Sequence, residues 1–321
     1  MSKQARTIIG IIVIALIVIL ILPNSKKAGL LKIGVIAPLS GVVADYGEEI
    51  RKGILDIGTS TKVSFVFEDE KCDPKETVAA FKKLTKFEKV NFILGPACGS
   101  PQEAIIPLIK EQGAIVLVPS AASRSLYEQS GKNFFNVQYS LEDESKFIGE
   151  RLNELGYKKV ALVHYKNAFS ETHAKSFKSA YKGEITDIVL TDETSDVAPE
   201  LVKIKSAKVD AVYSPDISFF FANGLLKLRQ YGVSVPVYST YVTELPAVKS
   251  FVPGVYYSYP SDLTGSKGAV FELSKQAGQI LSQYVEECSN SVSCVKEKLI
   301  NSGKFDEFGV FKRPLILKQI K

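Results

Sequence analysis

Residues 33–53, with the sequence IGVIAPLSGVVADYGEEIRKG, contain the strand and the helix that set the fold of this chain. The apolar run at residues 32–38 is typical of a strand that is buried on both faces of a sheet. A glycine-containing turn follows it, and residues 46–57 are predicted to form a helix. The segment therefore predicts a strand, a turn and a helix in direct succession.

The same alternation continues along the chain. Further strands are expected at residues 63–67, 91–95, 114–118, 159–164, 211–214 and 235–238. Asp73, Pro74 and Glu76 predict a helix start, with Asp73 as the N-cap and Pro74 at the first helical position. Ser100 and Glu103 predict a second helix start of this kind. Strand, helix and strand in succession predict an α/β fold of parallel sheets with helices on both faces.

Length and composition are those of a folded protein. The 321 residues can bury one large core or two moderate ones. Hydrophobic residues make up 45% of the chain and charged residues 23%, which is an ordinary globular composition. No low-complexity linker or sequence repeat divides residues 31–321, so composition alone does not place a domain boundary.

The formal net charge of +5 is concentrated at the amino terminus. Five basic residues lie within residues 1–32, where no acidic residue occurs, and this leaves 35 basic and 35 acidic residues in the rest of the chain. A protein that binds nucleic acid needs a basic surplus to neutralise phosphates. Nucleic acid is therefore not expected as a partner.

The amino-terminal segment predicts a membrane tether within residues 1–30. Residues 7–22 are uncharged and almost entirely Ile, Val and Leu. Sixteen helical residues span about 24 Å, a little less than a hydrocarbon core of about 30 Å. Lys3 and Arg6 favour a cytoplasmic amino end. We therefore expect a single-pass signal-anchor in the cell membrane, with the rest of the chain outside the cytoplasm.

A cleaved signal peptide is the alternative interpretation of this segment, because such peptides have apolar cores of roughly 7–15 residues. The sequence Pro-Asn-Ser-Lys-Lys at residues 23–27 contains no small-x-small cleavage site directly after the run. The first cysteine is Cys72, so no lipid-modified cysteine follows the segment. Export of the body is expected under both interpretations.

The four cysteines fit an oxidising compartment. None has Cys-x-x-Cys spacing, so a zinc site is not expected. Cys288 and Cys294 bracket a short polar loop that a disulfide could close. Cys72 and Cys98 then remain as the second pair, whose loop of about 25 residues would contribute about 3–4 kcal/mol in the chain-entropy model. Free buried thiols are the alternative.

Motifs for catalysis are missing. The chain has two histidines, His164 and His173, and neither lies in a His-Glu-x-x-His motif. It contains no Gly-x-Ser-x-Gly elbow, no Walker loop and no Gly-x-Gly-x-x-Gly. His164 lies at the end of a predicted strand without a catalytic partner. We therefore expect a binding protein that is not an enzyme and that carries no cofactor or metal.

Residues 33–53 resemble the beginning of the Leu/Ile/Val-binding-protein family, the type I periplasmic binding proteins of branched-chain amino acid ABC transporters. The resemblance recurs in the same order at EDEKCDPK (68–75), LGPAC (94–98), VPSAASRSL (118–126) and VHYKNAF (163–169), and it extends to residues 305–321. It covers the whole chain beyond the amino-terminal segment. It also implies a disulfide between Cys72 and Cys98.

The resemblance implies two Rossmann-like lobes joined by a three-segment hinge. The crossings are expected near Tyr139, near residues 255–257 and near residues 304–305. Lobe 1 would then contain residues 31–138 and 256–304, and lobe 2 would contain residues 139–255 and 305–321. A ligand would lie in the cleft between them, where strand ends and helix amino termini meet.

Helix amino termini present unpaired N–H groups, which suit a carboxylate or another anion. Tyr46 and Phe169 match aromatic residues that line the ligand pocket in the family. Packing is the alternative role for Tyr46, and helix capping is the alternative role for Ser100. The predicted ligand-binding residues are Tyr46, Cys98, Gly99, Ser100, Ser120, Ala121, Ala122, Ser123, Phe169, Asp216 and Tyr241.

Three positions depart from the pattern of the amino-acid binders. Gly99 stands where the family has a hydroxyl group for the ligand carboxylate, and Ala122 stands where it has a threonine after the fourth strand, with a serine one residue further along in each case. Tyr241 stands where the family has an acid for the ligand ammonium group, which Asp216 or Glu244 would have to replace. Because an unpaired buried ammonium group is costly, a neutral or differently charged metabolite is an alternative ligand.

The sequence therefore predicts an extracytoplasmic solute-binding protein that captures an amino acid or a related small metabolite for an ABC transporter. Its expected partners are the small ligand, an ABC permease and the membrane. The alternative is a ligand-sensing or structural ectodomain with the same fold and no transport role.

Overall fold

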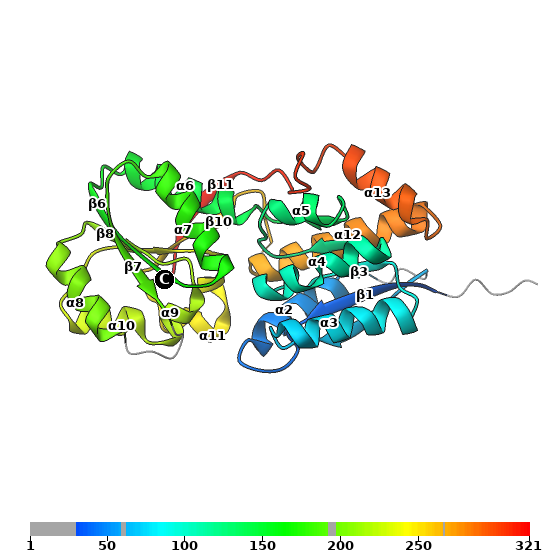
Figure 1. Cartoon of the computed structure of the whole chain (residues 1–321), viewed down its shortest axis with the longest axis horizontal. Coiled ribbons are helices and arrows are strands. Elements are labelled where there is room, and N and C mark those ends of the chain that lie inside the picture. Colours follow the sequence, from blue (N-terminus) through cyan, green and yellow to red (C-terminus); the bar gives the residue numbers. More distant parts are fainter. Residues whose placement is uncertain (1–29, 59–61, 192–196, 266) are drawn as a thin grey trace, which may run out of the picture.

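The computed structural model describes residues 30–58, 62–191, 197–265 and 267–321. These residues form two α/β lobes that lie side by side, each with its own β-sheet (Figure 1). The two-lobed α/β architecture that the sequence predicted is thereby confirmed.

The first lobe contains a five-stranded parallel sheet with the strand order β2-β1-β3-β4-β5. Helices α2 and α12 pack together, as do α3 and α4. The strands are β1 (Leu31–Ala37), β2 (Val63–Asp69), β3 (Phe92–Leu94), β4 (Ile115–Val118) and β5 (Phe134–Asn136). The helices are α2 (Ala44–Leu55), α3 (Pro74–Lys82) with its π-helical continuation η1 (Lys83–Phe87), α4 (Gly99–Gln112), α5 (Ser125–Gln129), α12 (Ala269–Glu287) and α13 (Val292–Asn301).

The second lobe contains a six-stranded sheet with the order β11-β10-β9-β8-β6-β7. Its strands are β6 (Lys159–Tyr165), β7 (Glu184–Leu190), β8 (Ala211–Tyr213), β9 (Val237–Ser239), β10 (Tyr256–Pro260) and β11 (Leu315–Gln319). Its helices are α6 (Leu141–Glu154), α7 (Ala168–Ala180), α8 (Ala198–Ala207), α9 (Ile217–Phe221), α10 (Gly224–Gln230), η2 (Tyr241–Glu244) and α11 (Pro246–Lys249). The parallel arrangement expected from the sequence holds for β6 to β10, whereas β11 pairs antiparallel with β10. This last strand enters the sheet directly from the hinge, without a helical crossover.

Local sequence explains why β1 and the helix starts lie where they do. Ile33 and Ile36 are fully buried and belong to different core clusters, because alternate side chains of a strand point to opposite faces. Asp73 caps α3 as predicted, and its carboxylate accepts the backbone N–H groups of Lys75 (2.8 Å) and Glu76 (3.0 Å). Helix α4 begins at Gly99, two residues before the predicted start, so Ser100 is not its N-cap.

Three segments connect the lobes, and two of them cross later than expected. The first crossing lies near Tyr139, between β5 and α6. The second follows Pro260, because β10 pairs with β9 in the second sheet. The third lies at residues 312–314, because Val310 still pairs with Asn136 of the first lobe. The boundaries expected at residues 256 and 305 therefore separate β10 from the sheet in which it pairs, and residues 305–311 from the first-lobe strand beside them.

Both expected cysteine pairs form disulfides in the structure. Cys72 and Cys98 have their Cα atoms 5.5 Å apart and link the end of β2 to the start of α4. Cys288 and Cys294, at a Cα separation of 5.6 Å, close the loop between α12 and α13. The first bond therefore fixes the turn on which the predicted carboxylate site depends.

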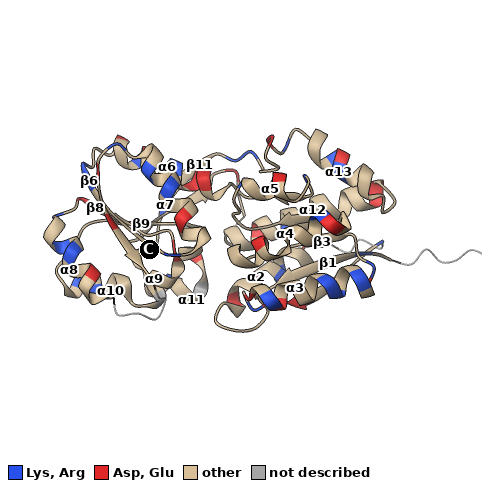
Figure 2. Ribbon diagram, viewed as in Figure 1, with Lys and Arg blue, Asp and Glu red and all other residues tan. Residues whose placement is uncertain are grey.

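The predicted membrane anchor at residues 1–30 lies outside the described residues, apart from Leu30. Within the ranges from residue 30 to residue 321 that the structure describes, no helix has the length and apolarity needed to cross a membrane. Lysine and arginine are interspersed with aspartate and glutamate over both lobes (Figure 2).

Candidate functional site

The first lobe presents the turn at residues 97–100 toward the second lobe. The disulfide from Cys98 holds this turn on one side. Glu70, at the end of β2, holds it from below, because its carboxylate accepts the backbone N–H of Ala97 at 3.0 Å and the hydroxyl of Thr77 at 3.1 Å. Burial raises the pKa of Glu70 to about 7, although these hydrogen bonds act in the opposite direction. The turn is therefore held by a covalent bond and by a buried carboxyl group.

Tyr46 and Ser120 lie on the same side of the first lobe. Both side chains are buried, with 7% and 1% of their surface exposed. Ser120 accepts a hydrogen bond of 2.9 Å from the amide of Gln102, which also donates to the carbonyl of Pro96. Burial raises the pKa of Tyr46 to about 12, so its phenol remains protonated and can donate a hydrogen bond.

The second lobe contributes Phe169, at the start of α7, and Tyr241, at the start of η2. Each meets a residue of the first lobe. The hydroxyl oxygens of Tyr241 and Tyr46 are 3.0 Å apart and form a hydrogen bond between the lobes. A Cβ atom placed on Gly99 would lie 3.4 Å from the Phe169 side chain, so glycine permits this close approach. Four of the predicted ligand-binding residues therefore meet where the two lobes touch.

Asp216, considered as the partner of a ligand ammonium group, accepts hydrogen bonds from three residues of the second lobe. It caps α9 by accepting the backbone N–H of Ser218 at 2.9 Å. Its other oxygen accepts the hydroxyl of Ser170 at 2.6 Å and the amide of Asn167 at 3.4 Å. Glu244, the other acid considered, accepts the Tyr257 hydroxyl at 2.9 Å beside the second crossing.

The remaining predicted residues are divided among three surroundings. Ser100 is exposed in the first turn of α4, while Ala121 and Ala122 are buried after β4. Ala122 pairs with Ser140 of the first crossing. Ser123 donates a hydrogen bond of 2.8 Å to Glu142 in α6, so its hydroxyl belongs to the hinge.

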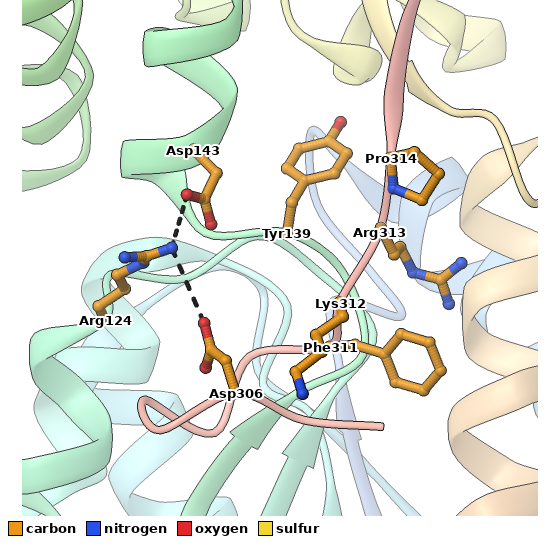
Figure 3. Close-up of a pocket in the computed structure, with 8 residues that line it drawn as sticks. All are labelled: Arg124, Tyr139, Asp143, Asp306, Phe311, Lys312, Arg313 and Pro314. Atoms are coloured by element: carbon orange, nitrogen blue, oxygen red, sulfur yellow. Dashed lines mark hydrogen bonds and ion pairs between the residues drawn. The ribbon is translucent and has the colours of Figure 1, made fainter. Parts of the chain in front are cut away.

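A pocket of about 430 Å³ lies at the hinge, and Figure 3 shows eight of its residues. Arg124 of the first lobe forms ion pairs with Asp143 of α6 at 2.6 Å and with Asp306 at 3.8 Å. Tyr139, which is almost fully buried, lies between these groups and the third crossing. The pocket is therefore bounded by both lobes and by two of the connecting segments.

Arg313 joins all three crossings. Its side chain is fully buried, and its Nε donates a hydrogen bond of 2.6 Å to the carbonyl of Val137 in the first crossing. One terminal nitrogen pairs with Asp262 of the second crossing at 2.5 Å, and the other donates to Gln276 of α12. Arg313 itself lies in the third crossing. One guanidinium group thus holds the hinge segments in register.

Sequence reasoning missed several buried polar residues near the lobe boundary. Gln102 lies on the same face of α4 as Ile105 and Ile109, and Glu144 lies on the same face of α6 as Ile148 and Leu152. A polar residue within an apolar helical stripe is the signal that could have found them. His173 of α7 is also fully buried, and its ring centroid lies 4.7 Å from that of Phe169.

Within the ranges that the structure describes, no group of three or more His, Cys, Asp or Glu residues has the arrangement of a metal site. The site is instead composed of aromatic rings, hydroxyl and amide groups, and the amino terminus of the 14-residue helix α4. Such a surface can surround a small molecule and hydrogen-bond its polar groups.

A sequence profile of the periplasmic binding protein family matches residues 31–302. Leu/Ile/Val-binding protein homolog 3 of Brucella melitensis is 29% identical over 212 residues, which cover 62% of this chain and 56% of that protein. The Leu/Ile/Val-binding protein of Escherichia coli is 23% identical over 207 residues, covering 59% of this chain and 55% of that protein. The chain thus aligns with little more than half the length of these curated relatives.

Solved structures show the same fold at lower identity. A leucine binding protein of Thermotoga maritima has a TM-score of 0.81 and 18% identity, and the match covers 91% of this chain and 96% of that one. A solute binding protein of R. palustris in complex with benzoate has a TM-score of 0.76 and 21% identity, with 91% and 94% covered. By its sequence match over residues 31–302, with a fold that agrees, this chain belongs to the periplasmic binding protein family.

Proposed function

We propose that this chain is an extracytoplasmic solute-binding protein that encloses one small ligand between its lobes. The observation that carries the proposal is the meeting of Tyr46 with Tyr241 and of Gly99 with Phe169. Both contacts join the lobes, and the second lies at the amino terminus of α4. The two lobes touch through aromatic side chains near a helix amino terminus. Such lobes can close on a small ligand and open to release it.

The ligand is an amino acid or a related small carboxylate. Helix α4 directs its amino terminus to the lobe boundary, which favours a negatively charged group there. Phe169, Tyr46 and Tyr241 offer ring surfaces for an apolar or aromatic part. The related proteins support this class, since one solved neighbour contains isoleucine and another contains benzoate.

Delivery to a membrane transporter follows from the same proposal. The closed form would bind the ligand more tightly than the open form, so the ligand would favour closure. The closed, ligand-loaded form would then dock on an ABC permease. Residues 7–22 would tether the protein to the cell membrane as an uncleaved signal-anchor. No catalytic step is part of this function.

A thermal-shift screen of the purified chain tests the proposal. L-leucine, L-isoleucine, benzoate and 4-hydroxybenzoate would be compared with glucose as a sugar control. A true ligand at 100 times its Kd adds about 2.7 kcal/mol to the free energy of unfolding, so its melting shift is readily measured. Phe169→Ala should abolish the shift, while Phe87→Ala, at a side chain that is 81% exposed, should retain it.

The ligand class is refuted if none of the amino acids or carboxylates raises the melting temperature. That result would favour the alternative function, a sensory or structural ectodomain of the same fold.

A further inference from the structure

Two buried polar side chains lie behind the second-lobe face of the site. Glu144 of α6 and His173 of α7 are both fully buried. Glu144 Oε2 and His173 Nε2 have no hydrogen-bond partner, and they lie 3.9 Å from each other. A buried polar atom without a partner is destabilising, because it has lost its hydrogen bonds to water. With a proton between them, the two atoms can form a hydrogen bond with each other. The bond is direct if they approach by about 1 Å, or it is made through one bridging water.

Each member of this pair contacts one of the aromatic groups that meet the first lobe. The carboxylate of Glu144 accepts the Tyr139 hydroxyl at 3.0 Å and the backbone N–H of Tyr241. The Tyr139 ring packs edge-on against Tyr241, with centroids 6.3 Å apart. The His173 ring packs edge-on against Phe169 at 4.7 Å. The pair thus lies behind both Tyr241, which bonds to Tyr46, and Phe169, which faces Gly99.

Among the residues that the structure describes, no lysine or arginine shifts the pKa of Glu144 or of His173. Ser145 Oγ lies 2.5 Å from His173 Nδ1 and 2.9 Å from the hydroxyl of Tyr213. The described polar groups that face Glu144 from the packed elements are those of Tyr139, His173, Tyr213, Tyr241 and Ser258. Within the set formed by Glu144 and these neighbours, the carboxyl of Glu144 is the group positioned to change its charge between pH 5 and pH 9.

We propose that Glu144 and His173 act as one proton-sharing unit that positions Tyr241 and Phe169 to contact the ligand and the first lobe. In the neutral state, Glu144 Oε2–H donates toward His173 Nε2, while His173 Nδ1–H donates to Ser145 Oγ. When the carboxyl loses its proton to water, Oε2 becomes a buried anion that the neutral imidazole can pair with only by moving its proton from Nδ1 to Nε2, which reverses the hydrogen bond with Ser145. Both residues are positioning residues, and the ligand part of this proposal rests on the proposed function.

Burial shifts both groups in the direction that this arrangement needs. It raises the pKa of Glu144 to about 7, while hydrogen bonds from Ser258, Tyr139 and Tyr241 oppose the shift. Burial lowers the pKa of His173 to about 3, so the imidazole remains neutral. Because the native pKa of Glu144 lies above its ordinary value, the protonated and positioned form is complete well below pH 7. It is lost as the pH rises through 7.

Nitrogen NMR of the imidazoles tests the pair without any ligand, since the chain has two histidines. In the full chain, the Nε2 resonance of His173 should change near pH 7 while the ring stays neutral. Glu144→Gln should abolish this change, because its amide donates to Nε2 at every pH. Glu70→Gln, at the other buried glutamate with a pKa of about 7, should retain it. A wild-type resonance that is constant from pH 5 to pH 9 would overturn the proposal.

Binding of L-leucine, L-isoleucine and benzoate tests the positioning. For a probe that binds, the wild-type Kd should rise at least fivefold from pH 6 to pH 8.5. The Kd of Glu144→Gln should equal that of the wild type at pH 6 and should be the same at pH 8.5. Glu144→Leu should raise the Kd at least tenfold at both pH values. Equal pH dependence in the wild type and Glu144→Gln would refute the positioning role. If no probe binds, the proposed function fails, and the NMR change still decides whether the pair exists.

Discussion

Replacing Arg313 with lysine tests whether one guanidinium group holds the hinge together. Arginine donates to Val137, Asp262 and Gln276 at once, whereas a lysine ammonium group can reach about one of them. The Asp262 side chain is 36% exposed, so its ion pair adds little to stability. The other two partners are lost from a fully buried donor, at about 1.5 kcal/mol each. Arg313→Lys should therefore lower the free energy of unfolding by about 3 kcal/mol.

Urea unfolding, followed by circular dichroism, measures this loss. Arg51→Lys is the matched control, because Arg51 is 44% exposed and pairs with Glu48 within α2. That substitution should change the free energy of unfolding by less than about 0.5 kcal/mol. If Arg313→Lys is as mild as its control, the three hydrogen bonds do not stabilise the hinge and the reasoning is refuted.

Three further predictions concern the first lobe. Burial raises the pKa of Glu70 from 4.5 to about 7, so its titration alone should lower stability by about 2–3 kcal/mol between pH 5 and pH 9. Glu70→Gln should reduce the fall in the urea-unfolding profile by that amount and leave the part that comes from Glu144; profiles parallel to the wild type would contradict this. Tyr46→Phe removes the hydrogen bond to Tyr241, which is worth about 1 kcal/mol, and should therefore raise the ligand Kd measured by calorimetry about fivefold. An unchanged Kd would show that this hydrogen bond plays no part in closure. Replacing Cys72 and Cys98 with serine opens a loop of 26 residues and should cost about 3.5 kcal/mol of stability, and a loss below about 1 kcal/mol would contradict the loop-entropy argument.

The strands that sequence analysis found are apolar runs. Strands β1, β4 and β6 lie in the middle of their sheets, and β2, at an edge, was found because residues 63–67 are also largely apolar. Strand β7 was missed because it lies at the edge of its sheet, where Thr186 and Asp187 interrupt the apolar pattern. Strand β11 was missed for the same reason, since it contains Lys318 and Gln319 and also lies at an edge. An edge strand has one neighbour and an exposed flank, so its sequence need not be continuously apolar.

The site could be predicted only in part. Individual members such as Tyr46 and Phe169 were identified from the resemblance, but their partners lie far away in the sequence. Tyr46 and Tyr241 are separated by 195 residues, and no local pattern indicates which tyrosine meets which. Glu144 and Arg313 resemble ordinary surface residues until the packing of α6 and the course of the hinge bury them. Their roles depend on topology, which the local sequence does not specify.

The distance between the lobes, measured by electron spin resonance on a doubly labelled chain, tests the central claim most directly. Labels at Val42→Cys and Phe251→Cys would be used, because both native side chains are well exposed and lie on different lobes. The account predicts two distance populations, with the shorter one enriched by a ligand from the thermal-shift screen and not by glucose. A single distribution that the ligand leaves unchanged would contradict closure of the lobes over a small guest.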